Sequence, residues 1–418
     1  MKNVDILILS NGVGEVVTWV RPVVKTLRQQ LDSYNVRISV ILSPCPHSTG
    51  KEAQIANSYP EVDRVQAAKD FFPFLLWGKT ATNWQWHKQG IVIFLGGDQF
   101  YTLVIGKRLG YKTLVYAEWE ARWYRYLDAF AVMNSQVMAK VPQRYHPKFT
   151  VVGDLIADVV LEVKSVSNSP AQLEPTTSMV GLLPGSKPAK LMQGVPLCMA
   201  IADAVQQSDS SVKFILPVAP TLDLATLAQY ADPQFNPLNK TFDNVSGQLI
   251  TTETQSYLLT AQGTKIQLIT QFPAYQHLIE CQLCITTVGA NTAELGALGI
   301  PAIVLLPTQQ LDAMRSWDGI PGILANLPLV GSNFAKLINW LILRQKKLFA
   351  WPNIWAKSEI MPEIVGKIRP KDIAAMILDF LAHPAKLQQI HHLLLQHRGS
   401  PGATQKIVSL VMQQLDEF

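Results

Sequence analysis

The stretch CITTVGANTAELGALGIPAIVLLP, residues 284–307, decides how the fold of this chain is read. An apolar run ends at Gly289, residues 290–292 lead into a short helical segment, and a second apolar run ends at Pro307. Strand, turn, helix and strand in this order are the repeating unit of a parallel sheet. The turn either only connects the strand to the helix or binds a ligand phosphate. A phosphate is possible because a helix N-terminus presents free N–H groups.

The same pattern recurs along the whole chain. Short apolar runs without polar alternation predict strands that are covered on both faces, and helical segments such as residues 17–31 lie between most of them. We therefore expect an α/β fold with two doubly wound halves in tandem. The predicted strands are residues 4–10, 37–43, 91–97, 112–118, 129–134 and 149–154 in the first half, and 179–186, 212–218, 266–270, 283–289 and 301–307 in the second.

Composition shifts suggest the domain limits. Residues 165–178 are rich in Ser, Pro and Thr and are interpreted as a linker, and residues 221–248 are polar, contain several prolines and are expected to form a surface excursion. The predicted parts are an N-terminal Rossmann-like domain over 1–165, a second Rossmann-like domain over 178–369, and C-terminal helices over 370–418 that pack back toward the first domain. The predicted helices of this tail are residues 370–383, 385–396 and 402–416.

The composition excludes several classes of protein. The 418 residues carry 36 Lys and Arg against 31 Asp and Glu, a diffuse net charge of +5, so we expect no nucleic-acid partner. The N-terminal apolar run is too short for a signal peptide, and no run is long enough to span a membrane. We therefore expect a cytoplasmic protein with reduced thiols, in which Cys281 and Cys284 pack in a strand rather than bind a metal.

In open parallel sheets, ligands bind at the carboxyl ends of the strands, so the residues after each apolar run are the candidates. In the first half, SNGVGE contains Asn11, Gly12, Gly14 and Glu15 and is either a tight turn or a ligand loop. In GGDQFY, Asp98 is placed either to accept a proton or to cap the following helix.

In the second half, LLPGSK combines backbone N–H groups, the hydroxyl of Ser186 and the ammonium of Lys187 after a strand. This combination suits a phosphate, although a turn with a surface lysine is the alternative. After Gly289, Glu294 lies on the first helical turn and either binds sugar hydroxyls or complements the helix dipole. The composition of residues 351–370 predicts a loop.

An aromatic segment, residues 71–88, stands apart from these strand ends. It combines tryptophan and phenylalanine with several lysines, which is the composition of an interfacial membrane segment; core or dimer packing is the alternative. The side chains expected to face a membrane are Phe72, Phe74, Trp77 and Trp84.

Seven segments, in the same order, resemble the lipid-A-disaccharide synthase family of inverting glycosyltransferases. They are SNGVGE, GGDQFY, KTLVYAEWEARW, FTVVGDLIAD, LLPGSK, TTVGANTAELGALGIPAIVLLP and WPNIWAKSEIMPEIVG. The resemblance implies a GT-B fold with two Rossmann-like domains facing a central cleft. It also implies a UDP-sugar donor as substrate, no metal or other cofactor, and a lipid or lipid-linked acceptor reached by peripheral contact with the inner face of the cytoplasmic membrane.

The resemblance also implies roles for individual residues. Asp98 and Glu15 would be catalytic, with Asp98 as general base on the acceptor hydroxyl, and the first loop, Asn11, Gly12 and Gly14, would lie on the acceptor side. The donor and its nucleotide would be bound by Gly185, Ser186, Lys187, Gly289, Ala290, Asn291, Thr292, Glu294, Asn353 and Glu359.

Several positions depart from the family pattern. Lys187 and Ser358 stand where the family has arginines, and Asp154 stands where it has a histidine. A lysine cannot make the two-pronged contact with phosphate that an arginine makes. These departures indicate a related branch rather than the housekeeping enzyme, and they leave two alternatives open: a UDP-GlcNAc 2-epimerase-like enzyme, and a non-catalytic binding protein on the same scaffold.

Overall fold

The computed structural model describes residues 2–31, 34–45, 48, 50–166, 178–307 and 348–417. The chain divides into two compact units. The first comprises Met1–Glu162 and Gly399–Phe418, and the second comprises Val163–Arg398. Most of the expected linker, residues 167–177, lies outside the described residues.

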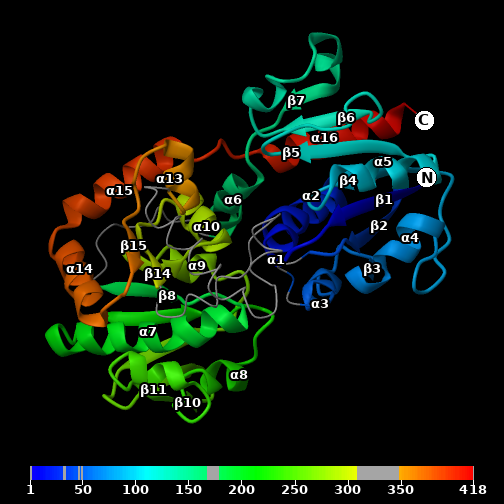
Figure 1. Ribbon diagram of the computed structural model, residues 1–418. Helices are drawn as coiled ribbons and strands as arrows, with labels where there is room; N and C mark the ends of the chain where they lie inside the picture. The colour runs from blue at the N-terminus through cyan, green and yellow to red at the C-terminus, as the bar shows by residue number, and fades with distance from the viewer. Residues whose placement is uncertain are drawn as a thin grey trace, which may run out of the picture. The chain divides into compact units, whose positions relative to one another are not determined.

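The first unit is built on a 7-stranded sheet with the order β3-β2-β1-β4-β5-β6-β7 (Figure 1). All neighbouring strands in it are parallel, as expected for apolar runs without polar alternation. The strands are β1 (Lys2–Ser10), β2 (Tyr34–Leu42), β3 (Arg64–Gln66), β4 (Gln89–Phe94), β5 (Lys112–Ala117), β6 (Ala129–Val132) and β7 (Phe149–Val151).

Helices connect these strands, and the last helix of the chain joins them. The red helix α16 (Ala403–Asp416) lies along the blue and cyan sheet in Figure 1 and packs on α2 (Arg21–Gln30). The remaining helices are α1 (Val13–Glu15), the π-helical turn η1 (Val16–Val20), α3 (Glu52–Asn57), η2 (Ala68–Asp70), α4 (Phe71–Trp77), α5 (Gln99–Leu109), η3 (Ser135–Met138), η4 (Gln143–Lys148), η5 (Leu155–Asp158) and α6 (Val159–Val166), which runs across the boundary of the two units.

The second unit is built on an 8-stranded sheet with the order β10-β11-β12-β9-β8-β13-β14-β15. Its centre is parallel, and β10 and β11 extend one edge as an antiparallel hairpin beside β12. The strands are β8 (Met179–Leu183), β9 (Lys213–Pro217), β10 (Gly247–Thr251), β11 (Ser256–Thr260), β12 (Lys265–Ile269), β13 (Leu283–Thr287), β14 (Ala302–Pro307) and β15 (Glu363–Gly366). The helices on the described residues of this unit are α7 (Pro188–Ser208), α8 (Leu224–Gln229), η6 (Pro237–Thr241), α9 (Tyr275–Leu278), α10 (Ala290–Leu298), α13 (Trp351–Ala356), α14 (Pro370–Ala382) and α15 (Pro384–His397).

The predicted strands are present in both units, but one expectation about an irregular segment was wrong. The excursion expected over residues 221–248 contains α8 and η6 and is anchored by the buried side chains of Phe242 and Asn239. Residues 351–370 are not a loop, because they form α13 and β15. In both segments prolines and polar residues interrupt the apolar positions, and burial against neighbouring elements decides the structure.

The C-terminal tail also divides differently from the expectation. Its three predicted helices are present, but α14 and α15 belong to the second unit, and only Gly399–Phe418 belongs to the first. The aliphatic face of α14 packs on α7, with Ile373 and Ile377 buried. Within the described residues, no helix is long and apolar enough to cross a membrane.

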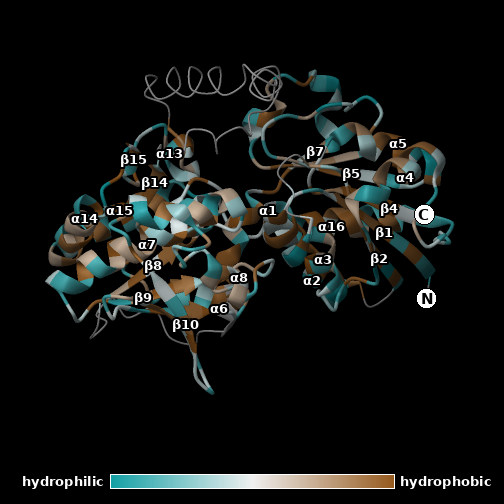
Figure 2. Ribbon diagram, turned by 60° about the horizontal axis from the view of Figure 1, so that its bottom comes forward, coloured by the Kyte–Doolittle hydropathy of each residue, from teal (hydrophilic) through white to brown (hydrophobic). Residues whose placement is uncertain are grey.

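Each unit has its own hydrophobic core, and the brown colour of the strands in Figure 2 shows that each core is centred on the sheet of its unit. The first unit buries several carboxyl groups, and one of them is that of Asp5 on β1. Its carboxylate accepts hydrogen bonds from Nε and Nη2 of Arg37 at 2.7 and 2.9 Å, from the Tyr111 hydroxyl at 2.7 Å and from the His87 backbone at 2.6 Å. Burial opposes ionisation of Asp5, but these hydrogen bonds outweigh it and lower its pKa.

Candidate functional site

In the second unit, two glycine turns leave the sheet side by side. β8 and β13 are parallel neighbours, and Leu183 on β8 pairs with Thr286 on β13. The turn after β8 contains Gly185 with φ +101°, and the turn after β13 contains Gly289 with φ +151°. Both values lie in the region that favours glycine, so the predicted turns PGSK and GAN depend on these residues for their shape.

Each turn leads directly into a helix. Lys187 is the N-terminal cap of α7, and Gly289 is the N-terminal cap of α10. The first N–H groups of a helix have no partner inside it, so both turns present donors and the positive end of a helix dipole at the same edge of the sheet. Gly185, Ser186 and Lys187 therefore lie beside Gly289, Ala290 and Asn291, as the phosphate-site prediction requires.

The sequence reasoning missed a second lysine at this edge. Lys190, on the first turn of α7, donates a hydrogen bond from Nζ to the Val288 carbonyl at 2.5 Å. Burial, followed by the charge of Lys187, lowers the pKa of the Lys190 ammonium to about 8. Its position three residues beyond the PGSK signature gave no sign of this role, because a lysine within a helical pattern is usually solvated.

Two residues of the predicted donor set have structural partners. The Thr292 side chain is fully buried, and its hydroxyl donates to the Gly289 carbonyl at 2.8 Å. Thr292 therefore holds the turn and cannot face a ligand with its side chain. The carboxylate of Glu294 accepts a hydrogen bond at 2.7 Å from the hydroxyl of Tyr275, which lies on α9, and this bond orients the Glu294 side chain.

Asn353 was wrongly predicted to contact the donor, because it is fully buried. Its amide donates to the Met361 carbonyl at 2.8 Å and to Glu363 at 2.7 Å, and its oxygen accepts from the backbone N–H groups of Ile360 and Met361. Asn353 thus joins α13 to β15 and shapes the segment between them. Glu359, in that segment, is exposed and accepts a hydrogen bond from the Glu363 N–H at 3.0 Å.

In the first unit, the exits of β1 and β4 are packed tightly together. A Cβ placed on Gly96 would lie 2.8 Å from Oδ1 of Asn11 and 3.3 Å from Cγ of Glu15. A Cβ on Gly12 would lie 2.5 Å from a carboxylate oxygen of Glu15. Asn11 and Glu15 are therefore held against two glycines, and Oδ1 of Asn11 is buried with no hydrogen-bond partner among the described residues. Gly14 precedes Glu15 in α1.

Asp98 lies at the exit of β4 and caps helix α5. Its Oδ1 accepts a hydrogen bond from the Phe100 N–H at 2.9 Å and lies 3.9 Å from Nη2 of Arg122. The capping alternative raised by the sequence is therefore realised. Capping occupies one carboxylate oxygen, and the side chain is 43% exposed, so the group also remains accessible to a reactant.

Two further carboxyls at this edge were not predicted as site residues. Glu118 directly follows β5, and Asp154 follows β7 and caps η5 through the Ile156 N–H at 2.9 Å. Burial raises the pKa of Glu118 to about 7, and the charges of Asp154 and Glu15 add to this. Burial likewise raises the pKa of Asp154 to about 6. Their places after strands could have pointed to them, but the depth of their burial could not be read from the sequence.

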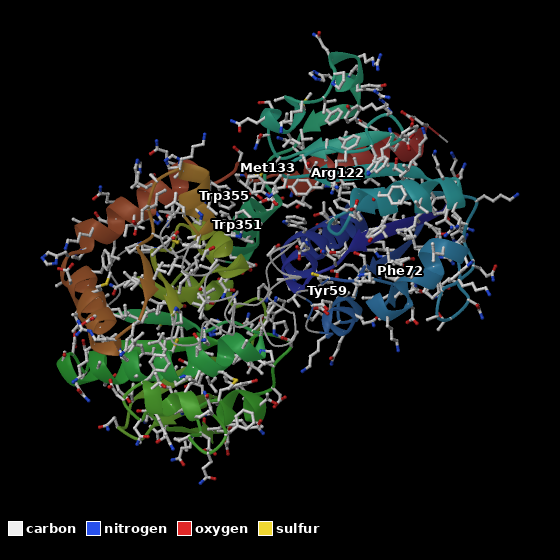
Figure 3. All side chains as sticks on the ribbon, viewed as in Figure 1. Tyr59, Phe72, Arg122, Met133, Trp351 and Trp355 are labelled. Carbon is white, nitrogen blue, oxygen red and sulfur yellow. The ribbon has the colours of Figure 1, made fainter. Side chains whose placement is uncertain are left out.

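The aromatic segment 71–88 is divided between core and surface. Phe74 was wrongly predicted to face a membrane, because it is fully buried and packs on Trp86 with ring centroids 5.7 Å apart. Trp84 is half-buried beside the Arg64 guanidinium, 4.3 Å from its ring centroid. Phe72 (Figure 3) and Trp77, on α4, are 50% and 67% exposed.

Cys284 lies on β13, and Cys281 lies two residues before that strand. Cys281 and Cys284 are free and buried in the second unit, and a Cβ on Gly181 of β8 would lie 2.6 Å from Sγ of Cys284. They fill space between β13 and β8. Within the described part of the chain, no group of three or more His, Cys, Asp or Glu side chains is arranged to hold a metal ion.

Two Rossmann-like α/β units of this kind, each with its loops at the carboxyl edge of a parallel sheet, define the GT-B fold. No family model matches the chain. The predicted resemblance is confirmed by curated relatives named lipid-A-disaccharide synthase. That of Geobacter metallireducens is 22% identical over 341 residues, which cover 78% of this chain and 75% of the relative. That of Nitrosococcus oceani is 22% identical over 324 residues, which cover 74% and 70%.

Solved structures share the fold at lower identity. The UDP-GlcNAc 2-epimerase of Neisseria meningitidis, bound to UDP-GlcNAc, superposes with a TM-score of 0.52 and 10% identity over 98% of this chain and all of its own. The complex of S. aureus MnaA with UDP superposes with a TM-score of 0.53 and 10% identity over 100% of this chain and 98% of its own. At this sequence identity, the similarity to these two solved structures establishes the GT-B fold and nothing about the reaction.

Proposed function

We propose that this protein is an inverting glycosyltransferase that moves a sugar from a UDP-sugar to a hydroxyl of a lipid or lipid-linked acceptor. The observation that carries the proposal is the pair of glycine turns at the exits of β8 and β13, where Ser186, Lys187 and the N-terminus of α10 meet. Helix N-termini, a hydroxyl and an ammonium form a suitable seat for a diphosphate. The curated relatives named lipid-A-disaccharide synthase support the same reaction class.

In this proposal the second unit binds the donor. Ser186, Lys187 and the turn Gly289–Asn291 hold the diphosphate, while Glu294 and Glu359 bind sugar hydroxyls. When the bond between the anomeric carbon and the diphosphate oxygen breaks, the electron pair stays on the diphosphate. Cations and helix N–H groups stabilise that charge, so the reaction requires no metal ion.

The first unit supplies the proton acceptor. Asp98 takes the proton from the acceptor hydroxyl as the hydroxyl oxygen forms its bond to the anomeric carbon, and attack opposite to the leaving group inverts the configuration. Asn11, Gly12 and Gly14 line the acceptor side, and Glu15 positions the hydroxyl. The exposed oxygen surface of Asp98 is compatible with this role while its other contacts keep it at the start of α5.

The lipid character of the acceptor is proposed from the exposed apolar side chains of α4, Phe72, Leu76 and Trp77, which would contact the cytoplasmic face of a membrane. Co-sedimentation with anionic vesicles tests this. A Phe72→Ser, Trp77→Ser double variant should lose binding, whereas Phe235→Ser, an equally exposed phenylalanine of the second unit, should not. Equal binding by the wild type and the double variant would remove the membrane contact from the proposal.

A thermal-shift panel of UDP-, GDP- and dTDP-sugars, followed by mass spectrometry of products formed with a membrane extract, tests the reaction itself. The proposal expects stabilisation by a UDP-sugar and a product that carries the sugar. Loss of UDP-GlcNAc without any acceptor would instead assign an epimerase. Tight UDP binding with no transfer to any lipid would assign a non-catalytic binding protein.

A further inference from the structure

Lys190 occupies the point where the two glycine turns of the second unit meet. Its side chain begins on the first turn of α7 and crosses to the exit of β13, where Nζ donates to the Val288 carbonyl at 2.5 Å. A Cβ on Gly289 would lie 3.1 Å from Nζ, and a Cβ on Gly185 would lie 2.8 Å from Cδ of Lys190. Both glycines therefore leave room for this one side chain.

The ammonium lies in an environment that lacks an anion. Val288 is its one hydrogen-bond acceptor within the described residues, and none of the carboxylates described there pairs with it. An ammonium has three N–H donors, so two remain for another acceptor. A buried cation without a counter-charge is costly, which is why its pKa falls to about 8. Supplying an anion would remove that cost.

A neighbouring polar group is also unsatisfied. Thr287, the last residue of β13, has a buried Oγ1 with no hydrogen-bond partner among the described residues. It directly precedes Val288, whose carbonyl holds Lys190. A buried hydroxyl without a partner costs free energy, and native structures leave few such groups. The unpaired hydroxyl and the unpaired ammonium thus lie at the exit of the same strand, beside the N-terminus of α10.

We propose that Lys190 binds the diphosphate of the nucleotide donor, adding a second positive charge beside Lys187 of the arginine-free PGSK turn. The inference rests on the proposed function, because it assigns a residue to the same donor site. The hydrogen bond to Val288 holds Nζ of Lys190 beside Gly289, within reach of an anion bound at the two turns. As the leaving diphosphate gains charge during transfer, this contact strengthens, so Lys190 contributes to turnover as well as to affinity.

Calorimetric titration of the full chain with UDP, uridine and inorganic pyrophosphate tests the inference. The Lys190→Met variant keeps the apolar stem and removes the charge, and it should weaken UDP and pyrophosphate binding by roughly 10- to 100-fold while leaving uridine unaffected. Lys190→Arg keeps the charge and should recover part of the loss. Lys213→Met, an exposed lysine at the start of neighbouring β9, is the matched control and should bind UDP as the wild type does.

The outcomes separate this inference from the proposed function. Unchanged UDP affinity in Lys190→Met, or an equal loss for uridine and UDP, would overturn the diphosphate contact while glycosyl transfer stands. A loss specific to UDP or pyrophosphate in a protein that transfers no sugar would support the contact and overturn the transferase. Circular dichroism and urea midpoints of the variants distinguish lost binding from lost folding.

Discussion

Glu118 provides the sharpest quantitative prediction, because the fold holds it at an energetic cost. Its carboxyl lies after β5, and burial raises its pKa to about 7 from an ordinary value of 4.5. The folded state therefore binds the proton more tightly than the unfolded chain does. The stability associated with Glu118 is fully present below pH 4.5 and is lost as the pH rises through 7.

Replacing Glu118 by Gln removes that pH-dependent cost while keeping the size of the side chain and an oxygen acceptor. The pKa difference of about 2.5, at 1.36 kcal/mol for each pKa unit, corresponds to about 3 kcal/mol of unfolding free energy above pH 7. The Glu118→Gln variant should thus be more stable than the wild type by up to about 3 kcal/mol at alkaline pH and nearly equal to it in mild acid.

Urea unfolding followed by tryptophan fluorescence, at about pH 5 and about pH 8, measures this difference. Glu120→Gln is the control, since Glu120 is 65% exposed and pairs with Arg122 at the surface, and its effect should stay within about 0.5 kcal/mol at either pH. A stabilisation of Glu118→Gln that is the same at both pH values would refute the ionisation argument. Destabilisation at pH 8 would show that the ionised carboxylate has a favourable partner.

Three further substitutions test the site and the fold. Asparagine caps a helix as well as aspartate does but cannot accept the proton, so Asp98→Asn should lose turnover. Its UDP affinity and urea midpoint should stay near those of the wild type. Wild-type turnover in this variant would remove Asp98 from the mechanism. Asn353→Ala removes one donor to the Glu363 carboxylate and leaves the backbone groups of Ile360 and Met361, just before β15, without their side-chain partner. It should cost about 3 kcal/mol in urea unfolding, and a loss below about 1 kcal/mol would contradict its role as a buried joint. Asp5→Asn removes the counter-charge of Arg37 and should cost about 3 kcal/mol at neutral pH. Because the folded pKa of Asp5 lies below 3.8, that difference should shrink as the pH falls through the acidic range, and a difference that does not change with pH would speak against the ion pair.

Local patterns were sufficient for the frame of the fold. Continuous apolar runs placed the inner parallel strands of both units within a few residues, because a strand covered on both faces needs nothing but apolar side chains. The strands β3 and β15 and the hairpin β10–β11 were not predicted, because strands at or next to a sheet edge are partly solvated and their composition resembles that of a loop. The PGSK and GAN turns were recognisable because glycine followed by polar residues, directly after an apolar run, is typical of a turn that leads from a strand into a helix.

The partners of individual side chains were decided only by the tertiary structure. The sequence indicated two uses for Asp98, and the fold adds the Phe100 N–H that makes it a cap. The resemblance predicted that Asn353 binds the donor, but in the structure Asn353 is buried and its hydrogen bonds connect α13 to β15. Lys190 looked like a solvated helical lysine until β13, almost a hundred residues later, brought the Val288 carbonyl to it. Strand positions follow from local composition, whereas burial and charge pairing depend on residues far away in the chain, which only the folded structure brings together.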